Sequence, residues 1–128
     1  MWHASTWGDS VQYGIDATWQ AAEDISTGDV VVTHDAFDRG IAKATSGQTN
    51  IVGIAQVSIA SGNTGVVRIF GEGVVNVGDN LVSKGDLLMA STTPGVATTA
   101  SNVSYYGQIC GMALESNTGL VKVFIYHI

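Results

Sequence analysis

The chain has 128 residues, of which 45% are apolar, and it contains sixteen glycines, one proline and one cysteine. This length predicts one domain of ordinary size, and the apolar fraction excludes a chain that is disordered throughout. The single cysteine, Cys110, excludes a disulfide framework, and no zinc-type spacing of Cys and His occurs in the sequence.

Charge is sparse and unevenly placed. Residues 1–38 hold seven acids and no Lys or Arg, whereas residues 39–128 hold four acids and five bases, so −7 and +1 give the net charge of −6. Phosphate backbones and anionic membranes attract clustered Lys and Arg, so we expect neither nucleic acid nor a membrane as a partner. The sequence does not begin with basic residues followed by an apolar stretch, so it predicts no signal peptide. Because only 12% of the residues are charged, we expect much of the surface to contact other chains.

Residues 1–25 are predicted to form an acidic, aromatic arm ahead of a β domain at residues 26–128. Four aromatic residues of this arm are candidates for partner contacts: Trp2, Trp7, Tyr13 and Trp19. Two interpretations remain open, because the arm can dock on a partner or fold back and cap one end of the domain. A short helix is expected only at Ala17–Asp24.

The remainder of the chain predicts an all-β fold, a compact barrel or sandwich. Val, Ile and Thr total 38 residues against five Leu, a bias that favours strands over helices. Gly71-Glu72-Gly73 is interpreted as a turn between two strands. In chain order the predicted strands are Asp29–His34, Gly40–Ala44, Ile51–Ile59, Val66–Phe70, Gly73–Val77, Asn80–Ser83, Asp86–Ala90, Gly107–Leu114 and Leu120–Tyr126.

Three segments recur in the same order in the two halves of the domain. The matched pairs are Gly28–Val32 with Gly78–Val82, Ile51–Ala55 with Ile109–Ala113, and Asn63–Phe70 with Asn117–Phe124. The simplest account is a duplicated unit of about 50 residues, with halves at roughly 26–77 and 78–128 that share one core.

Each matched segment contains residues with a structural role. Gly-Asp pairs make tight turns, a glycine inside a strand marks a bulge or a close backbone approach, and Asn-Thr-Gly places glycine at a left-handed position. The residues expected to act in this way are Gly28, Asp29, Gly53, Gly65, Gly78, Asp79, Gly111 and Gly119.

Signals for chemistry are few, so we predict no enzyme and no cofactor. His34, Asp35 and Asp38 are close enough in sequence to bind a divalent ion, although the same cluster is typical of a solvated turn. Cys110 lies between Ile109 and Gly111 and is predicted to be a packed thiol rather than a nucleophile. Neither a Gly-x-Ser-x-Gly elbow nor a phosphate-binding loop occurs in the sequence.

The segments Gly28–Val32, Ile51–Ala55, Ile59–Gly65 and Gly71–Val74, followed by Gly111–Glu115, resemble the small decoration, or cement, proteins of tailed-phage capsids. This resemblance covers roughly residues 26–126. It implies a structural virion protein on the outer capsid surface, with the major capsid protein as partner. It also implies a homotrimer and stabilisation of the assembled shell. The leading candidates for contacts with the shell or with a neighbouring subunit are then Trp2, Trp7, Tyr13 and Trp19.

A second resemblance competes with the first. Gly85–Leu88, Ser91–Ala97 and Gly111–Glu115 are similar to β modules of phage head and tail fibres, which implies a role in attachment. Met112 stands where the fibre pattern often has Lys, and the long repetitive shaft of a fibre is lacking; both departures favour the capsid interpretation. A small hydrolase or metal protein built around His34 and Asp38 is the third hypothesis.

Overall fold

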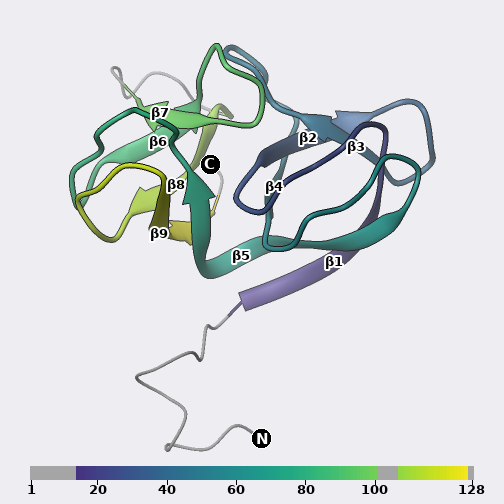
Figure 1. Ribbon diagram of the computed structural model, residues 1–128, viewed down its shortest axis with the longest axis horizontal. Coiled ribbons are helices and arrows are strands. Elements are labelled where there is room, and N and C mark those ends of the chain that lie inside the picture. The colour runs from purple at the N-terminus through teal and green to yellow at the C-terminus, as the bar shows by residue number, and fades with distance from the viewer. Residues whose placement is uncertain (1–13, 101–106, 127–128) are drawn as a thin grey trace, which may run out of the picture.

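The computed structural model describes residues 14–100 and 107–126, and every regular element in this part of the chain is a β-strand. The all-β prediction is therefore confirmed (Figure 1). The strands are β1 (Gly14–Ala21), β2 (Val30–His34), β3 (Gly40–Lys43), β4 (Ile51–Ala55), β5 (Thr64–Asn76), β6 (Leu87–Ala90), β7 (Ala97–Thr99), β8 (Ile109–Ala113) and β9 (Leu120–Ile125).

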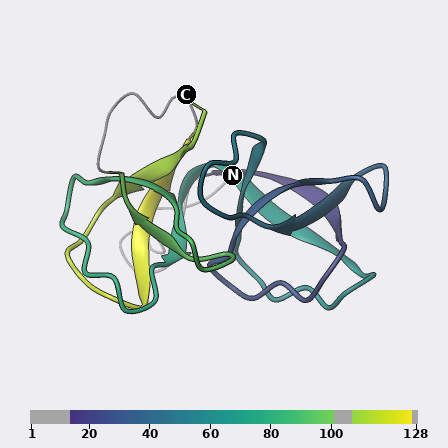
Figure 2. The same ribbon diagram turned by 90° about the horizontal axis from the view of Figure 1, so that it is seen from above.

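Five strands close into a barrel. Four of them follow the order β3-β2-β4-β5. β1 closes the barrel, because it pairs with both end strands of this order, parallel to β3 and antiparallel to β5. The sheet then continues from β5 through β9, β8 and β6 to β7. In Figure 1 the barrel strands β1–β4 lie on the right and β6–β9 on the left, and β5 runs from one group to the other. Figure 2 shows the two groups side by side.

The second group repeats the strand order of the first. Strands β3-β2-β4-β5 and β7-β6-β8-β9 both pair antiparallel throughout. Even the irregularities correspond, since the register shifts after Val31 in β2 and after Leu88 in β6, the residues opposite Gly53 and Gly111. We interpret the described residues as two units, a first unit of residues 14–70 and a second unit of residues 71–100 and 107–126.

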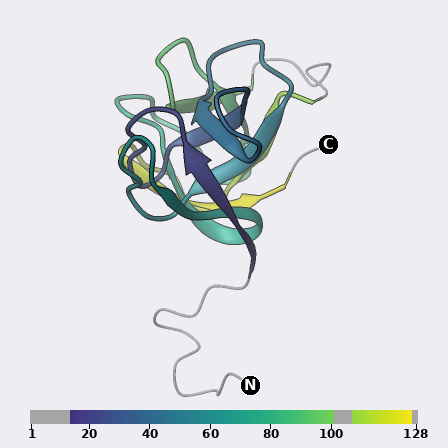
Figure 3. The ribbon, with the colours of Figure 1, turned by 90° about the vertical axis from the view of Figure 1, so that its right-hand side faces the viewer.

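The long strand β5 belongs to both units. It pairs with β1 from Thr64 to Gly71 and with β9 from Gly71 to Asn76. Gly71 has a φ of 111°, a conformation that favours glycine, at the residue where β5 exchanges one partner for the other. β1 therefore takes the same place in the first unit that the second half of β5 takes in the second. Figure 3 views the molecule from the side of the first unit, with β1 in front.

The strand pairing corrects the register of the sequence repeat. The counterpart of Gly28-Asp29 is Gly85-Asp86, not Gly78-Asp79. Asp29 Oδ2 accepts the Ser26 N–H at 2.8 Å, and Asp86 Oδ2 accepts the Ser83 N–H at 2.9 Å. The main-chain bonds agree, because the N–H groups of Gly28 and Gly85 donate to Ala55 O at 2.7 Å and to Ala113 O at 2.8 Å. Gly78-Asp79 has the same letters but lies in the turn after β5.

Three predictions of local structure were wrong, and one strand was not predicted. The expected helix at Ala17–Asp24 is largely β1, because pairing with β3 and β5 on both sides overrides the local preference. The expected turn at Gly71–Gly73 is continuous strand within β5. The expected strand at Asn80–Ser83 is reduced to one bridge, Val82 with Asn117, and β7 was not predicted at all.

The buried apolar residues form two clusters. One lies inside the barrel and draws on all five of its strands, with Val31, Ile41, Val52 and Val67 among its members. The other fills the second unit and also includes residues of β2 and β4 that point out of the barrel, such as Val30 and Ile54. These two strands are thus buried on both faces, which explains their nearly continuous apolar sequence.

Main-chain hydrogen bonds join the two units. The loop between β6 and β7 reaches the first unit through Gly95, whose O accepts the Val30 N–H and whose N–H donates to Ala44 O, both at 2.9 Å. Asn76 N–H donates to Gly28 O at 2.8 Å.

The described part of the chain contains no helix that could span a membrane.

Candidate functional site

The loop that carries His34, Asp35 and Asp38 is an exposed turn between β2 and β3. His34 Nδ1 accepts the Ala36 N–H at 3.1 Å, which fixes the start of the turn. Both carboxylates are exposed to solvent. Within residues 14–100 and 107–126, no three His, Cys, Asp or Glu side chains are grouped so that they could hold a metal ion.

Cys110 is a buried thiol in β8, as predicted. Its Sγ donates to Leu88 O at 3.5 Å. Burial raises the pKa of the thiol to about 12, because a thiolate in this apolar surrounding would lose its solvation. At neutral pH the side chain therefore stays protonated, and it lacks the reactivity of a catalytic cysteine.

Trp19 is the one candidate contact residue of the arm that the structure describes. It lies in β1 opposite Gly65, and its ring packs against the cluster inside the barrel. The Arg39 guanidinium lies 4.2 Å from the centre of the ring, a cation–π contact. Its Nε1 is buried and has no hydrogen-bond partner among the described residues. Trp2, Trp7 and Tyr13 lie outside the described residues.

Gly53 in β4 and Gly111 in β8 occupy equivalent positions beside a neighbouring strand. A Cβ added at Gly53 would collide with the carbonyl oxygen of Arg68 in β5, and one at Gly111 would lie 2.5 Å from the carbonyl oxygen of Phe124 in β9. β4 therefore lies too close to the backbone of β5 for a side chain at Gly53, and β8 lies too close to the backbone of β9 for one at Gly111.

The turn glycines differ from the expected pattern at one position. Gly28, Gly78 and Gly119 have φ of 90°, 57° and 74°. Gly65 does not have a positive φ, because β5 has already begun there and its backbone is extended. Gly62 takes the left-handed position instead, with φ of 85°. Asp79 is exposed in the turn after β5.

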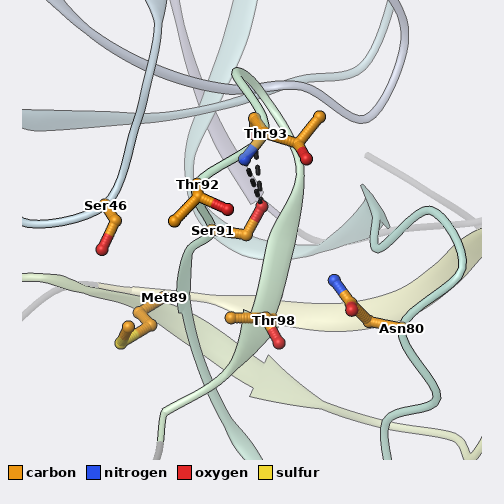
Figure 4. Close-up of a pocket in the computed structure, with 7 residues that line it drawn as sticks. All are labelled: Ser46, Asn80, Met89, Ser91, Thr92, Thr93 and Thr98. Atoms are coloured by element: carbon orange, nitrogen blue, oxygen red, sulfur yellow. Dashed lines mark hydrogen bonds between the residues drawn. The ribbon is translucent and has the colours of Figure 1, made fainter.

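A hollow of about 250 Å³ lies between the two units (Figure 4). Its lining is mainly hydroxyl-bearing, with Ser46 from the first unit and Ser91, Thr93 and Thr98 from the second. Ser91 Oγ accepts the Thr93 N–H at 3.1 Å and donates to Thr93 O at 3.2 Å, so this hydroxyl serves its own turn. Among the described residues, no titratable side chain lines the hollow, and those that line it offer no acid, base or nucleophile activated by a base.

The described surface carries a row of apolar side chains, which we name the apolar strip. It consists of Leu87, Met112, Phe124, Phe70 and Ile15. Cross-strand pairing joins Leu87 to Met112 and Met112 to Phe124. Phe124 and Phe70 meet edge to face with ring centres 5.3 Å apart, and Phe70 lies opposite Ile15. The strip therefore crosses β6, β8, β9, β5 and β1.

The apolar strip is exposed most strongly at its β1 end. Ile15 is 58% and Phe70 48% exposed, whereas Leu87, Met112 and Phe124 are half-buried. A hollow of about 230 Å³ opens there between Ile15, Phe70 and Phe124. The strip was not predicted from the sequence, although the outward alternation of Leu120, Lys122 and Phe124 along β9 could have indicated one part of it.

Comparison with solved structures finds a similar fold in a phage protein. The crystal structure of the head fiber gp8.5 N base in bacteriophage phi29 has a similar fold, with a TM-score of 0.65. The two sequences are 19% identical, and the similarity covers 88% of this chain and 94% of that one. No curated protein matches the chain.

The family comparison is more specific. The model of the phage cement proteins matches residues 10–124, which is most of the chain and includes both units. This family comprises phage structural proteins and is not an enzyme family. The chain belongs to the phage cement protein family, and it is a capsid-associated structural protein of the virion, located on the outer capsid.

Proposed function

We propose that this protein binds the assembled capsid from outside and stabilises it, as a homotrimer whose partner is the major capsid protein. The observation that carries the proposal is the match to the cement protein family over residues 10–124. A protein that binds the assembled shell and not its dissociated subunits stabilises the shell by mass action. Three linked copies would bind with higher avidity than one.

The surface of the two units supports contact with other proteins. The apolar strip exposes Ile15 and Phe70, and large apolar groups of this kind are common at protein interfaces. Trp2, Trp7 and Tyr13 remain proposed contact residues. Trp19 has a structural part in the barrel wall, so its replacement would alter the fold as well as any contact. The expectation that nucleic acid is not a partner rests on charge and stays a prediction.

Reconstitution tests the proposal. Capsids of the source phage that lack this protein are mixed with the purified chain, and co-sedimentation and the temperature of capsid disruption are measured. We expect saturable binding and a higher disruption temperature. Trp7→Ala should weaken binding while the circular dichroism spectrum stays unchanged. Failure of the intact chain to sediment with capsids at any concentration would contradict the proposal.

A fibre-base role is the second candidate. It is favoured by the structural similarity to a phage head fibre base, which at this identity establishes only the fold. A fibre component would be present in few copies per particle and would be needed for attachment to cells. Binding to many sites on the capsid would exclude this role, whereas binding confined to a few sites would favour it.

A further inference from the structure

The apolar strip occupies a face that is already an interface in the other unit. Leu87 pairs with Met112 one residue before Leu88 pairs with Gly111. In the first unit, Val30 pairs with Ile54 one residue before Val31 pairs with Gly53. Leu87 and Met112 are therefore the counterparts of Val30 and Ile54.

The second unit covers this face of the first. Val30 and Ile54 are both fully buried, in one cluster with second-unit residues such as Val75 and Val123. The β6–β7 loop closes over the beginning of β2, where Gly95 O accepts the Val30 N–H. The outer face of β2 and β4 is thus the contact between units, and the equivalent face of β6 and β8 is left partly open.

The residue at the edge of this face differs between the units. The strand pairing also corrects the sequence match at this position. The counterpart of Phe124 is Arg68 and not Phe70, because Ile54 pairs with Arg68 as Met112 pairs with Phe124. Arg68 binds Asp16 through Nε at 2.6 Å and donates from Nη1 to Glu72 O at 2.6 Å. The second unit has an aromatic ring at this position, and Phe70 and Ile15 extend the apolar surface beyond it. Covering such a row removes apolar area from water, which is favourable.

We propose that a second copy of this chain docks on the apolar strip and covers the second unit at the face that, in the first unit, the second unit covers. The proposal deepens the self-association in the proposed function and rests on it. The occupant is a copy of this chain because the strip includes Leu87 and Met112, the counterparts of two residues that already contact another part of the same chain. Contacts that join different surfaces of identical chains are head-to-tail, and they form a closed ring when the rotation permits.

Charge complementarity indicates which part of the second copy approaches. The counterpart of the covering β6–β7 loop is the β2–β3 loop, which exposes Asp35, Asp38 and Arg39. Arg39 is held by the Trp19 ring and by Thr18 O, and the two carboxylates give the loop a net negative charge. The covering loop lies against Asp29, because a Cβ added at Gly95 would lie 2.8 Å from that side chain. The counterpart of Asp29 is Asp86, and the exposed Lys84 lies two residues before it. The acidic β2–β3 loop of one copy is therefore expected beside Lys84 of the next.

The first test replaces Phe124 with Arg, the residue that the first unit has at this position. The molar mass of the full chain is measured by light scattering across a concentration series, with circular dichroism as a check of folding. We expect F124R to weaken association on the order of 30-fold, the effect of losing one strong interface residue. Leu81→Arg is the matched control, because Leu81 is 73% exposed and outside the strip, and it should keep the mass of the unaltered chain.

A second pair of variants keeps the test decisive if F124R does not fold. Lys84→Asp should weaken association, and adding Asp38→Lys should restore it; both positions are exposed. A monomeric unaltered chain, or F124R and K84D proteins with unaltered mass, would overturn the proposal. Capsid co-sedimentation of the same samples separates the two proposals: loss of oligomers with capsid binding retained at high concentration supports the strip, whereas unaltered oligomers without capsid binding contradict only the proposed function.

Discussion

The side chain of Gln56 bonds to the main chain of Val74 in both directions. Its Nε2 donates to Val74 O at 3.1 Å, and its Oε1 accepts the Val74 N–H at 3.0 Å. Gln56 directly follows β4 in the first unit, and Val74 lies in the part of β5 that belongs to the second. The amide therefore acts as a short strand segment between the units. Gly73 makes room for it, since a Cβ there would lie 2.7 Å from Oε1.

Gln56→Ala should lower the free energy of unfolding by about 1–3 kcal/mol, because it leaves the part-buried N–H and C=O of Val74 without these partners. Urea denaturation measures the change. Gln48→Ala is the control, since Gln48 Oε1 accepts one bond, from the Thr45 N–H in a turn. Equal losses for the two variants would show that the bridge between the units contributes nothing special.

Gly53→Ala and Gly111→Ala should each destabilise the fold by about 2–4 kcal/mol, because the new methyl group meets a main-chain oxygen that cannot rotate away. Thermal and urea unfolding give the change. Gly47→Ala is the comparison, because no atom lies within 4 Å of its Cβ position, although its φ of 89° carries a cost of about 1 kcal/mol. If all three variants lose the same stability, the close approach of the strands is not what requires glycine.

Asp29 predicts a pH dependence of stability. Burial raises the pKa of this carboxyl above its ordinary value of 3.8, and the Ser26 N–H only partly opposes the shift. The folded state therefore binds the proton more tightly than the unfolded state. The contribution of Asp29 to stability is greatest below about pH 4, and it falls as pH rises through the raised pKa.

The unfolding free energy of the unaltered chain, relative to that of Asp29→Asn, should accordingly decrease as pH rises from about 3. Asn keeps an oxygen that can accept the Ser26 N–H but does not titrate. Asp86→Asn is the matched control, because Asp86 accepts the equivalent Ser83 N–H in a more exposed turn. A difference that stays constant or grows with pH would contradict the sign of the shift.

Trp19→Ala should reduce stability by about 2–4 kcal/mol, because the ring packs against the barrel cluster and makes a cation–π contact with Arg39. Thermal unfolding followed by circular dichroism measures the loss. Arg39→Ala is the informative companion, and it should cost less than 1 kcal/mol, since it removes only the cation–π contact and the bond from Arg39 Nε to Thr18 O. An unchanged unfolding temperature for Trp19→Ala, together with weaker capsid binding, would instead make Trp19 a contact residue.

The sequence predicted which segments form strands better than it predicted which strands pair. Strand positions after Gly28 were largely recognisable, because β-branched runs between Gly, Asn and Asp residues are typical of strands and turns. β1 was not recognisable as a strand, because the residues that pair with it are remote in sequence. Gln20 pairs with Gly40, and Gly14 pairs with Gly71. The repeat was visible, but Gly78-Asp79 matched the letters of Gly28-Asp29 while Gly85-Asp86 has the matching hydrogen bonds.

The apolar strip was out of reach of the sequence for a similar reason. Its five residues come from five strands, and only the register of those strands puts them in one row. By contrast, the burial of Cys110 was predictable because its apolar neighbours along β8 indicate a buried strand.

The number of copies in the virion tests the central claim most directly. Purified particles of the source phage are analysed by quantitative mass spectrometry, with this chain measured against the major shell protein. A capsid-stabilising cement protein predicts a ratio on the order of one copy per one to a few shell subunits, because binding at repeated sites is what stabilises the assembled state. A ratio of a few per cent would contradict that role and indicate a fibre or vertex component, and absence from particles would contradict both.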